Sequence, residues 1–336
     1  MLKTSFLFVV ALAFTTAAQE PDSTKICGVS YVSMNTEFDS SFVRPVLEVG
    51  ANWVGIIPYC FMTSATQPEL HYNHKMQWQG ERLDGAREII QRNHARGLKV
   101  MVKPQIWIHH GIYTGKITMN SDEEWQAFED NYSKYILDFA RMAEEEGVAM
   151  FCIGTEMGRV VNERPEIFER LIEKVREEFS GKLTYASNWD DYHGVGFWKV
   201  LDYIGVDAYF PLAKEAKASV GKLKSGWTPH WRELDSLSDA TDVPVLFTEY
   251  GYRSSVGCAI RPWDYSNNEE TKIDQKEQLR ALSALYEVIW DEPNFAGGFL
   301  WKWHPKHEQA GGKNNSMFTV QNKMAEEVVR ERYSAN

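Results

Sequence analysis

Two glutamates stand where hydrolytic chemistry could be done. Glu156 lies at the end of the apolar segment 149–157, and Glu249 lies near the end of the apolar segment 243–251. Such runs, rich in β-branched and apolar residues, are typical of buried strands, so each carboxyl group would stand where a strand meets a loop. Hydrolysis of a glycosidic bond needs one carboxyl group to protonate the leaving oxygen and a second to attack the sugar or to activate water. A single strand-end glutamate is more often a surface charge, so the hypothesis depends on the pair.

The elements that must position these glutamates alternate along the chain. Apolar runs predict strands at 26–33, 51–59, 99–107, 149–157, 183–189, 203–209, 243–251 and 297–303. Amphipathic segments predict helices at 81–97, 122–147, 164–181, 274–293 and 324–333, the first three closing on Gly97, Gly147 and Gly181. Continuous apolar strands separated by helices indicate a parallel sheet covered by helices. We therefore predict an α/β protein with one (β/α)8 TIM barrel domain, for which 336 residues suffice. An open doubly wound sheet is the alternative, but no GxGxxG motif follows the first strand.

A closed barrel would bring the two glutamates together. Glu156 is on the predicted fourth strand and Glu249 on the seventh, and these strands face one another across the barrel mouth. Inward carboxyl groups there could approach to about 5–5.5 Å, the separation associated with a retaining mechanism. Glu249 would then have to be ionised, whereas Glu156 would have to hold a proton. The nearby negative charge of Glu249 would raise the pKa of Glu156 in that direction.

The N-terminal residues 1–18 predict a secretory signal peptide. Lys3 precedes an apolar stretch, and small residues lead up to a cleavage position after Ala18. The apolar stretch is too short for a permanent membrane anchor. Residues 19–336 would form the catalytic domain of a secreted or periplasmic protein. The net charge of −11 disfavours nucleic acid and anionic membranes, so we expect a neutral substrate, no nucleic-acid or membrane partner, and a monomer.

Cysteines and histidines leave some alternatives open. Cys27, Cys60, Cys152 and Cys258 allow three disulfide pairings, or they are buried thiols in a large core, and the sequence does not decide between these. The histidine-containing segments 71–74, 109–110 and 304–307 match no zinc signature. We therefore predict no metal and no organic cofactor. A metal-dependent barrel hydrolase is the alternative, and chelation would test it.

Aromatic and polar side chains at predicted strand ends are candidates for binding a sugar. The aromatic candidates are Trp107, Trp189, Tyr209, Tyr250, Trp301 and Trp303. Their rings can stack on the C–H faces of sugars, although any one of them could equally pack in the barrel wall. The polar candidates are Lys103, His109, Asn188 and Tyr209, which could bind hydroxyl groups or satisfy the backbone. A buried Lys103 would need a partner, either Glu156 or a substrate hydroxyl group.

Four segments resemble one family of glycosidases. They are IGTEMGR (153–159), IGVDAYFPL (204–212), VLFTEYGYRS (245–254) and FLWKWHP (299–305). They are similar to segments of the clan A retaining glycoside hydrolases, and most of all to family 113, the β-1,4-mannanases. The resemblance covers essentially the whole mature chain. It implies that Glu156 is the acid/base, that Glu249 is the nucleophile and that Trp301 is the platform below the reacting sugar. Thr155 replaces the asparagine that is usual in the clan, and a GTE motif is typical of family 113.

The resemblance and the glutamate pair together predict a secreted endo-β-1,4-mannanase that degrades mannan or manno-oligosaccharides by double displacement. Two alternatives remain. One is another clan A specificity, for glucan or glucomannan. The other is a carbohydrate-binding barrel that has lost catalysis, which the retention of both Glu156 and Glu249 disfavours.

Overall fold

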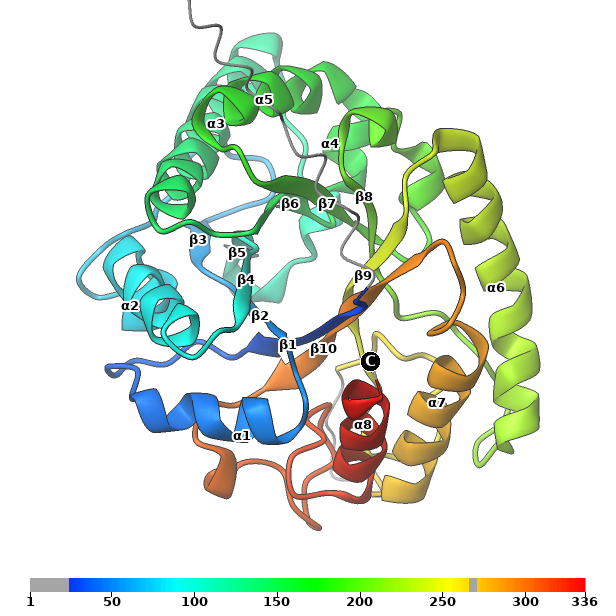
Figure 1. The fold of residues 1–336 in the computed structure, drawn as a ribbon. Coiled ribbons are helices and arrows are strands. Elements are labelled where there is room, and N and C mark those ends of the chain that lie inside the picture. The colour runs from blue at the N-terminus through cyan, green and yellow to red at the C-terminus, as the bar shows by residue number, and fades with distance from the viewer. Residues whose placement is uncertain (1–23, 266–270, 336) are drawn as a thin grey trace, which may run out of the picture.

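The computed structural model describes residues 24–265 and 271–335, so the predicted signal peptide 1–18 lies outside the described residues. The barrel strands are β1 (Ile26–Tyr31), β2 (Trp53–Ile56), β4 (Lys99–Val102), β6 (Met150–Thr155), β7 (Lys182–Asn188), β8 (Tyr203–Asp207), β9 (Val245–Tyr250) and β10 (Phe295–Trp303). They pair in chain order, all parallel, and β10 closes on β1 (Figure 1). The predicted (β/α)8 barrel is confirmed, with Glu156 directly after the fourth barrel strand and Glu249 on the seventh.

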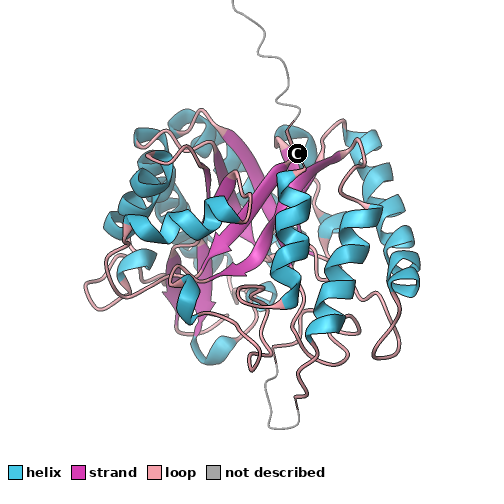
Figure 2. Cartoon of the chain, turned by 60° about the horizontal axis from the view of Figure 1, so that its bottom comes forward, coloured by secondary structure: helices cyan, strands magenta, loops and turns pink. Residues whose placement is uncertain are grey.

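Helices cover the outside of the barrel (Figure 2). They are α1 (Arg44–Glu48), α2 (Leu83–His94), α3 (Asp122–Glu145), α4 (Gly158–Glu163), α5 (Pro165–Glu178), α6 (Val220–Thr241), α7 (Gln275–Val288) and α8 (Met324–Ser334). Gly97 and Gly147 follow α2 and α3 with φ of +80° and +64°, the left-handed conformation that ends a helix. Gly181 does not play this part, because α5 already ends at Glu178. No helix among the described residues is long and apolar enough to cross a bilayer.

Helix α6 is not predicted by the sequence pattern. Pro229 lies inside it and removes one backbone donor, and Gly226 further weakens the helical signal. The helix nevertheless buries Leu223, Trp227, Trp231 and Leu234 against the barrel. The ring of Trp227 stacks on Phe247 of β9 with the centroids 5.9 Å apart. Burial of this apolar face therefore outweighs the poor local propensity.

Two predicted strands are each divided by a proline. Beyond Pro58 and Pro104, the short strands β3 (Tyr59–Met62) and β5 (Gln105–Ile108) form a separate parallel pair. Proline has no N–H group, so it interrupts a strand ladder. The two strands stay side by side across this break, because the N–H of Gln105 donates to the carbonyl of Pro58 at 2.9 Å. The pair extends the barrel wall beyond its carboxyl-terminal end and carries Tyr59, Gln105 and Trp107 there.

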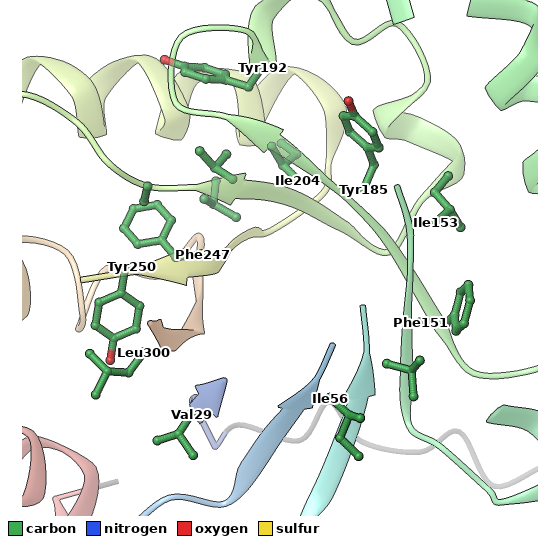
Figure 3. Close-up of a cluster of buried hydrophobic side chains, with 14 of the residues drawn as sticks. Val29, Ile56, Phe151, Ile153, Tyr185, Tyr192, Ile204, Phe247, Tyr250 and Leu300 are labelled. Carbon is green, nitrogen blue, oxygen red and sulfur yellow. The ribbon is translucent and has the colours of Figure 1, made fainter. Parts of the chain in front are cut away.

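Side chains fill the barrel on both sides of its wall. A small inner cluster includes Met101, Met150, Cys152, Leu246 and Phe299. A larger cluster lies between the strands and the helices, and Figure 3 shows members of it, among them Val29, Phe151, Ile204, Phe247 and Leu300. All four cysteines are buried and none forms a disulfide, so the structure places them as core thiols.

Candidate active site

A register shift in β9 aims Glu249 into the barrel. On one side Val206 and Asp207 of β8 pair with Phe247 and Glu249, so β9 carries one extra residue; the pairing with β10 shows a similar shift. Such a bulge interrupts the alternation of side chains between the two faces of a strand. Thr248 and Glu249 consequently both face Asp207: Thr248 donates a hydrogen bond to its carboxylate at 2.7 Å. Glu249 is only 6% exposed.

Glu249 belongs to a buried cluster of charges. The ammonium group of Lys103, which is fully buried, donates to Oε1 of Glu249 at 2.7 Å and to the two carboxylate oxygens of Asp207 at 2.8 and 3.0 Å. A buried ammonium group needs such partners, because its desolvation is costly. One cation thus faces two carboxyl groups. Burial, and next the charge of Glu249, raise the pKa of Asp207 to about 7.

Two uncharged donors complete the surroundings of Glu249. The amide of Gln105 donates to Oε1 at 3.0 Å, and the hydroxyl group of Tyr209 donates to Oε2 at 2.8 Å. Burial, and then the charge of Glu249, raise the pKa of Tyr209 well above its ordinary value, so this hydroxyl group stays protonated and remains a donor. The carboxylate is therefore held at both oxygens by three donors, two from residues 103–105 and one from Tyr209.

Glu156 lies in a different environment. It follows β6 with φ of +53°, an uncommon conformation for a residue other than glycine, and its N–H group donates to the carbonyl of Ala186 at 2.7 Å. Its carbonyl group accepts a hydrogen bond from Thr114 at 3.3 Å. Its half-buried carboxyl group accepts none from the described residues. Burial, followed by the charges of Asp207 and Glu249, raises the pKa of Glu156 well above its usual value. This group is therefore suited to hold a proton.

An aromatic patch lies beside the two glutamates. Trp301 of β10 packs in one small cluster with Ile57, Tyr209 and Phe318, and Trp189 borders this cluster. Trp189 in turn stacks on Trp263, with the ring centroids 4.9 Å apart and the planes 19° from parallel. Flat rings at the mouth of the barrel are the surfaces on which a sugar ring can rest.

A cavity of about 500 Å³ adjoins Trp301. Its walls include Tyr59, Phe61, Trp78, Trp107, Trp301 and Lys302, and Trp78 and Trp107 are 49% and 52% exposed. Neither Glu156 nor the residues that contact it line this cavity. An apolar, aromatic hollow with a few polar groups is the usual form of a small-molecule site. Its volume is large enough for more than the reacting sugar alone.

The structure brings several predicted residues into this site. Glu156, Glu249, Lys103, Tyr209 and Trp301 lie at the mouth of the barrel. Lys103 bonds to Asp207 and Glu249, rather than to Glu156 or a sugar as predicted. Trp107 lines the cavity and Trp189 borders the aromatic cluster.

Two predicted binding residues do not belong to the site, because both point outward. Tyr250 is fully buried, and its hydroxyl group lies 2.6 Å from that of Tyr333 and 3.1 Å from that of Tyr286, between the barrel and helices α7 and α8 (Figure 3). Trp303 is also fully buried in the outer core, with its ring 5.4 Å from that of His307. The pairing of β10 with β1 shifts register between Leu300 and Trp303, so Trp303 does not share the face of Trp301.

Two polar candidates have local partners instead. The amide of Asn188 donates to Asp190 at 2.7 Å, which ties down the chain after β7. His109 is exposed after β5, with its ring 3.9 Å from that of His110. Neither contact places the side chain against Glu156 or Glu249. Among the described residues, no group of three histidine, cysteine, aspartate or glutamate side chains is arranged to hold a metal ion.

The sequence pattern did not predict three residues around Glu249, namely Asp207, Gln105 and Thr248. Gln105 bonds to Glu249 directly, Asp207 is linked to it through Lys103, and Thr248 bonds to Asp207. The signal for Asp207 was present, since an acidic residue at the end of an apolar strand, two positions before Tyr209, parallels the two glutamates. Gln105 had no such signal, because it follows Pro104 inside what reads as one strand. Trp78 had a weaker signal, because it lies in the long aromatic and polar loop 60–80, which a barrel is expected to place on its active face.

Comparison with known proteins adds a family and a set of related structures. The model of glycoside hydrolase family 113 matches residues 31–323. The structure of a family 113 β-mannanase from Alicyclobacillus acidocaldarius in complex with ManMIm is 27% identical, with a TM-score of 0.81, covering 94% of this chain and 98% of that one. A family 113 β-1,4-mannanase that is 22% identical has a TM-score of 0.80, covering 93% and 100% of the two chains.

A more distant likeness concerns the fold alone. A β-glucuronidase from an uncultured Clostridium sp. is 14% identical, with a TM-score of 0.62, covering 93% of this chain and 51% of that one. A comparison with curated protein sequences found no match.

Proposed function

The chain belongs to glycoside hydrolase family 113, and on this premise we propose that it is a retaining endo-β-1,4-mannanase acting on mannan or manno-oligosaccharides. The observation that carries the mechanism is the contrast between two carboxyl groups. Glu249 is surrounded by the donors Lys103, Gln105 and Tyr209, as an ionised nucleophile requires. The carboxyl group of Glu156 accepts no hydrogen bond from the described residues, and its pKa is raised, as a general acid requires.

The first step forms a glycosyl-enzyme. Oε1 of Glu249 accepts bonds from Lys103 and Gln105, whereas Oε2 accepts only one from the described residues, from Tyr209. Oε2 therefore keeps a lone pair with which to attack the anomeric carbon. As the new C–O bond forms, the glycosidic C–O bond breaks, and Glu156 gives its proton to the departing oxygen. The ring of Trp301 supports the sugar as it flattens.

The second step releases the sugar. Once Glu249 carries the sugar as an ester it is neutral, so the charge that helped to keep Glu156 protonated is gone. Glu156 then takes a proton from water, whose oxygen attacks the anomeric carbon and displaces Glu249. Two inversions at the same carbon give net retention of configuration.

The cavity supports a chain longer than one sugar. Because Glu156 protonates the leaving group, the leaving part of the substrate lies on the Glu156 side. We place the sugars toward the non-reducing end in the cavity beside Trp301, which the carboxyl group of Glu156 does not line. Rings at Trp78 and Trp107 suit a neutral sugar, since stacking needs no charge. This is the reason for proposing an enzyme that acts within a chain.

Secretion belongs to the same proposal. Its support is the signal-like composition of residues 1–18, with Lys3 before an apolar stretch. A neutral polysaccharide too large to enter a cell fits a secreted or periplasmic enzyme. Mass spectrometry of the mature protein from the culture medium or the periplasm would give its first residue, and an intact N-terminus in the cytoplasm would contradict this part.

One experiment tests activity, specificity and mechanism together. The purified protein is incubated with mannohexaose labelled at its reducing end, with cellohexaose and with glucomannan, and the product lengths are read by mass spectrometry. Proton NMR during the first turnovers gives the anomer that is released. Internal cleavage of mannohexaose with the β-anomer formed first is the expected result. Cleavage of cellohexaose alone would reject the specificity, and the α-anomer first would reject retention.

A further inference from the structure

We propose that Lys103 and Asp207 form a positioning pair for hydrolysis, in which Lys103 aims the Glu249 carboxylate and Asp207 fixes Lys103. The inference rests on the proposed role of Glu249 as nucleophile. Neither residue needs to touch the substrate for this purpose. Lys103 is 0% exposed and Asp207 is 1% exposed, so both lie beneath the floor of the site.

The contacts of Lys103 are arranged as a bridge. Its N–H group donates to the carbonyl of Ile56 at 2.9 Å, so its backbone is fixed at the end of β4. Its ammonium group has three protons, and its neighbours are Oε1 of Glu249 at 2.7 Å and both oxygens of Asp207 at 2.8 and 3.0 Å. No proton is left over for a sugar hydroxyl group. Lys103 therefore acts on the reaction through Glu249.

Asp207 also holds the ammonium group of Lys103, and it is itself held by β9. It accepts a hydrogen bond from Thr248 at 2.7 Å, and Thr248 directly precedes Glu249. The bulge in β9 thus presents both neighbours, Thr248 and Glu249, to the Lys103–Asp207 pair. This arrangement fixes the direction of the Glu249 side chain from two sides, because Tyr209 holds Oε2 from the end of β8. Misplacing an attacking group by about 1 Å can cost about 100-fold in rate.

Titratable groups from several strands interact with this pair or with Glu249. Besides Lys103, Asp207 and Glu249 themselves, they are Tyr59 of β3, Cys152 of β6, Glu156 directly after β6, Tyr209 shortly after β8, Tyr265, and Lys302 of β10. When Glu156 is protonated, Lys103 is the cation between two buried carboxylates. Removing either member of the pair therefore changes the charge felt by Glu156 by one unit, with opposite signs.

The charges of Asp207 and Lys103 shift the pKa of Glu156 in opposite directions. The charge of Asp207 raises its pKa and that of Lys103 lowers it. Loss of the Asp207 charge should let Glu156 give up its proton at lower pH, and loss of the Lys103 charge should delay this to higher pH. Activity needs protonated Glu156, so the alkaline limb of the pH profile reports both changes. A purely structural role would weaken the protein without moving this limb in two directions.

The test uses Lys103→Met, Asp207→Asn and the double variant, with kcat and KM measured across pH on manno-oligosaccharides. We expect Lys103→Met to lose about 100-fold in kcat/KM, mostly in kcat, and to shift the alkaline limb upward. Asp207→Asn should shift it downward. The double variant removes the excess negative charge and should regain about tenfold over Lys103→Met. Because Lys103→Met leaves two buried carboxyl groups unbalanced, it is the variant that could fail to fold; the other two then decide.

A matched control removes an ion pair elsewhere, whose carboxylate is buried and whose guanidinium is exposed. Glu129 of α3 is 5% exposed and bonds to Arg170 of α5 at 2.7 Å, on the outside of the barrel. Glu129→Gln should lower thermal stability and leave the alkaline limb in place. Suppose that the wild-type enzyme is active, but the alkaline limb of Asp207→Asn and of the double variant does not move, or moves only as it does in Glu129→Gln. That result would overturn this inference and leave the proposed function standing. A wild-type enzyme that cleaves no β-glycoside would overturn the proposed function, and this inference with it.

Discussion

At the residue scale, the two glutamates differ in what compensates a negative charge. Glu249 has an ammonium group, an amide and a phenol within hydrogen-bonding distance. Glu156 has burial and two neighbouring negative charges, and these favour its neutral form. The proposed roles of nucleophile and acid follow from these surroundings, since the side chains themselves are the same.

Replacing Glu249, the proposed nucleophile, should abolish turnover, and a small added nucleophile should restore it. Glu249→Ala is expected to lower kcat at least roughly 10⁴-fold, since no group remains to form the glycosyl-enzyme. It also leaves a space into which azide fits. Azide should restore turnover of an aryl β-mannoside and yield the α-mannosyl azide, which NMR identifies. Turnover near the wild-type rate without azide would reject Glu249 as nucleophile.

Replacing the acid should have an effect that depends on the leaving group. Glu156→Gln is expected to slow glycosylation by mannohexaose by about 10²–10⁴-fold, the usual contribution of a general acid. The phenolate of an aryl mannoside with an acidic phenol departs without protonation. The glycosylation step of such a substrate should therefore be slowed far less. Single-turnover kinetics on both substrates measures this step. Equal losses on the two substrates would show that Glu156 does not donate the proton.

At the scale of elements, the ends of β9 and β10 decide which side chains reach the site. The register shift in β9 turns Glu249 inward and Tyr250 outward, where Tyr250 joins helices α7 and α8 through Tyr286 and Tyr333. The hydroxyl group of Tyr333 also donates to the carbonyl of Gly28 in β1 at 2.7 Å. This outer network ties the last helix to the closing strands of the barrel.

A pair of tyrosine variants separates the two sides of the barrel wall. Tyr250→Phe removes buried hydrogen bonds and should lower the free energy of unfolding by about 1–2 kcal/mol, with kcat/KM within about twofold of wild type because the site is untouched. Tyr209→Phe removes the donor to Oε2 of Glu249 and should lower kcat by roughly 10²-fold. Urea unfolding and steady-state kinetics on both variants provide the comparison. A clear loss of kcat in Tyr250→Phe would return this residue to the site.

At the scale of the whole molecule, the substrate cleft is assembled from distant parts of the chain. Trp78 comes from the loop after β3, Trp107 from β5, and Trp301 from the last barrel strand. In the proposed function, the extension of the wall by β3 and β5 lets a sugar chain leave the reacting centre and still contact the protein.

Shortening this cleft should change which bond is cut. Trp78→Ala and Trp107→Ala are each expected to lower kcat/KM for mannohexaose by about tenfold, since stacked rings contribute on the order of 1–2 kcal/mol, while mannobiose or mannotriose is affected little. The cleavage positions in end-labelled mannohexaose should shift toward the non-reducing end, because fewer sugars are held there. Val200→Ala, at an exposed apolar side chain just before β8 and so at the amino-terminal end of the barrel strands, serves as the control. An unchanged cleavage pattern in both cavity variants would contradict the placement of the non-reducing end.

The sequence by itself determined the architecture and the strand positions of the two glutamates that we propose to react. Apolar runs separated by amphipathic segments specify parallel strands and covering helices, and strands that follow one another in the chain pair as neighbours, so the positions of Glu156 and Glu249 on the fourth and seventh strands were readable in advance. The aromatic rim was also readable, though not member by member. Helix α6 was not, because packing of its tryptophans overrides Pro229.

Only the tertiary structure decided which strand-end residues face inward. Strict alternation from Leu246 in the inner cluster would send Glu249 outward and Tyr250 inward, and one inserted residue in β9 reverses both. The shift in β10 similarly separates Trp303 from Trp301. Lys103 found its partner Asp207 across the barrel, 104 positions along the chain. Such outcomes depend on how neighbouring strands register and on which charges meet once the barrel closes, and a local pattern contains neither.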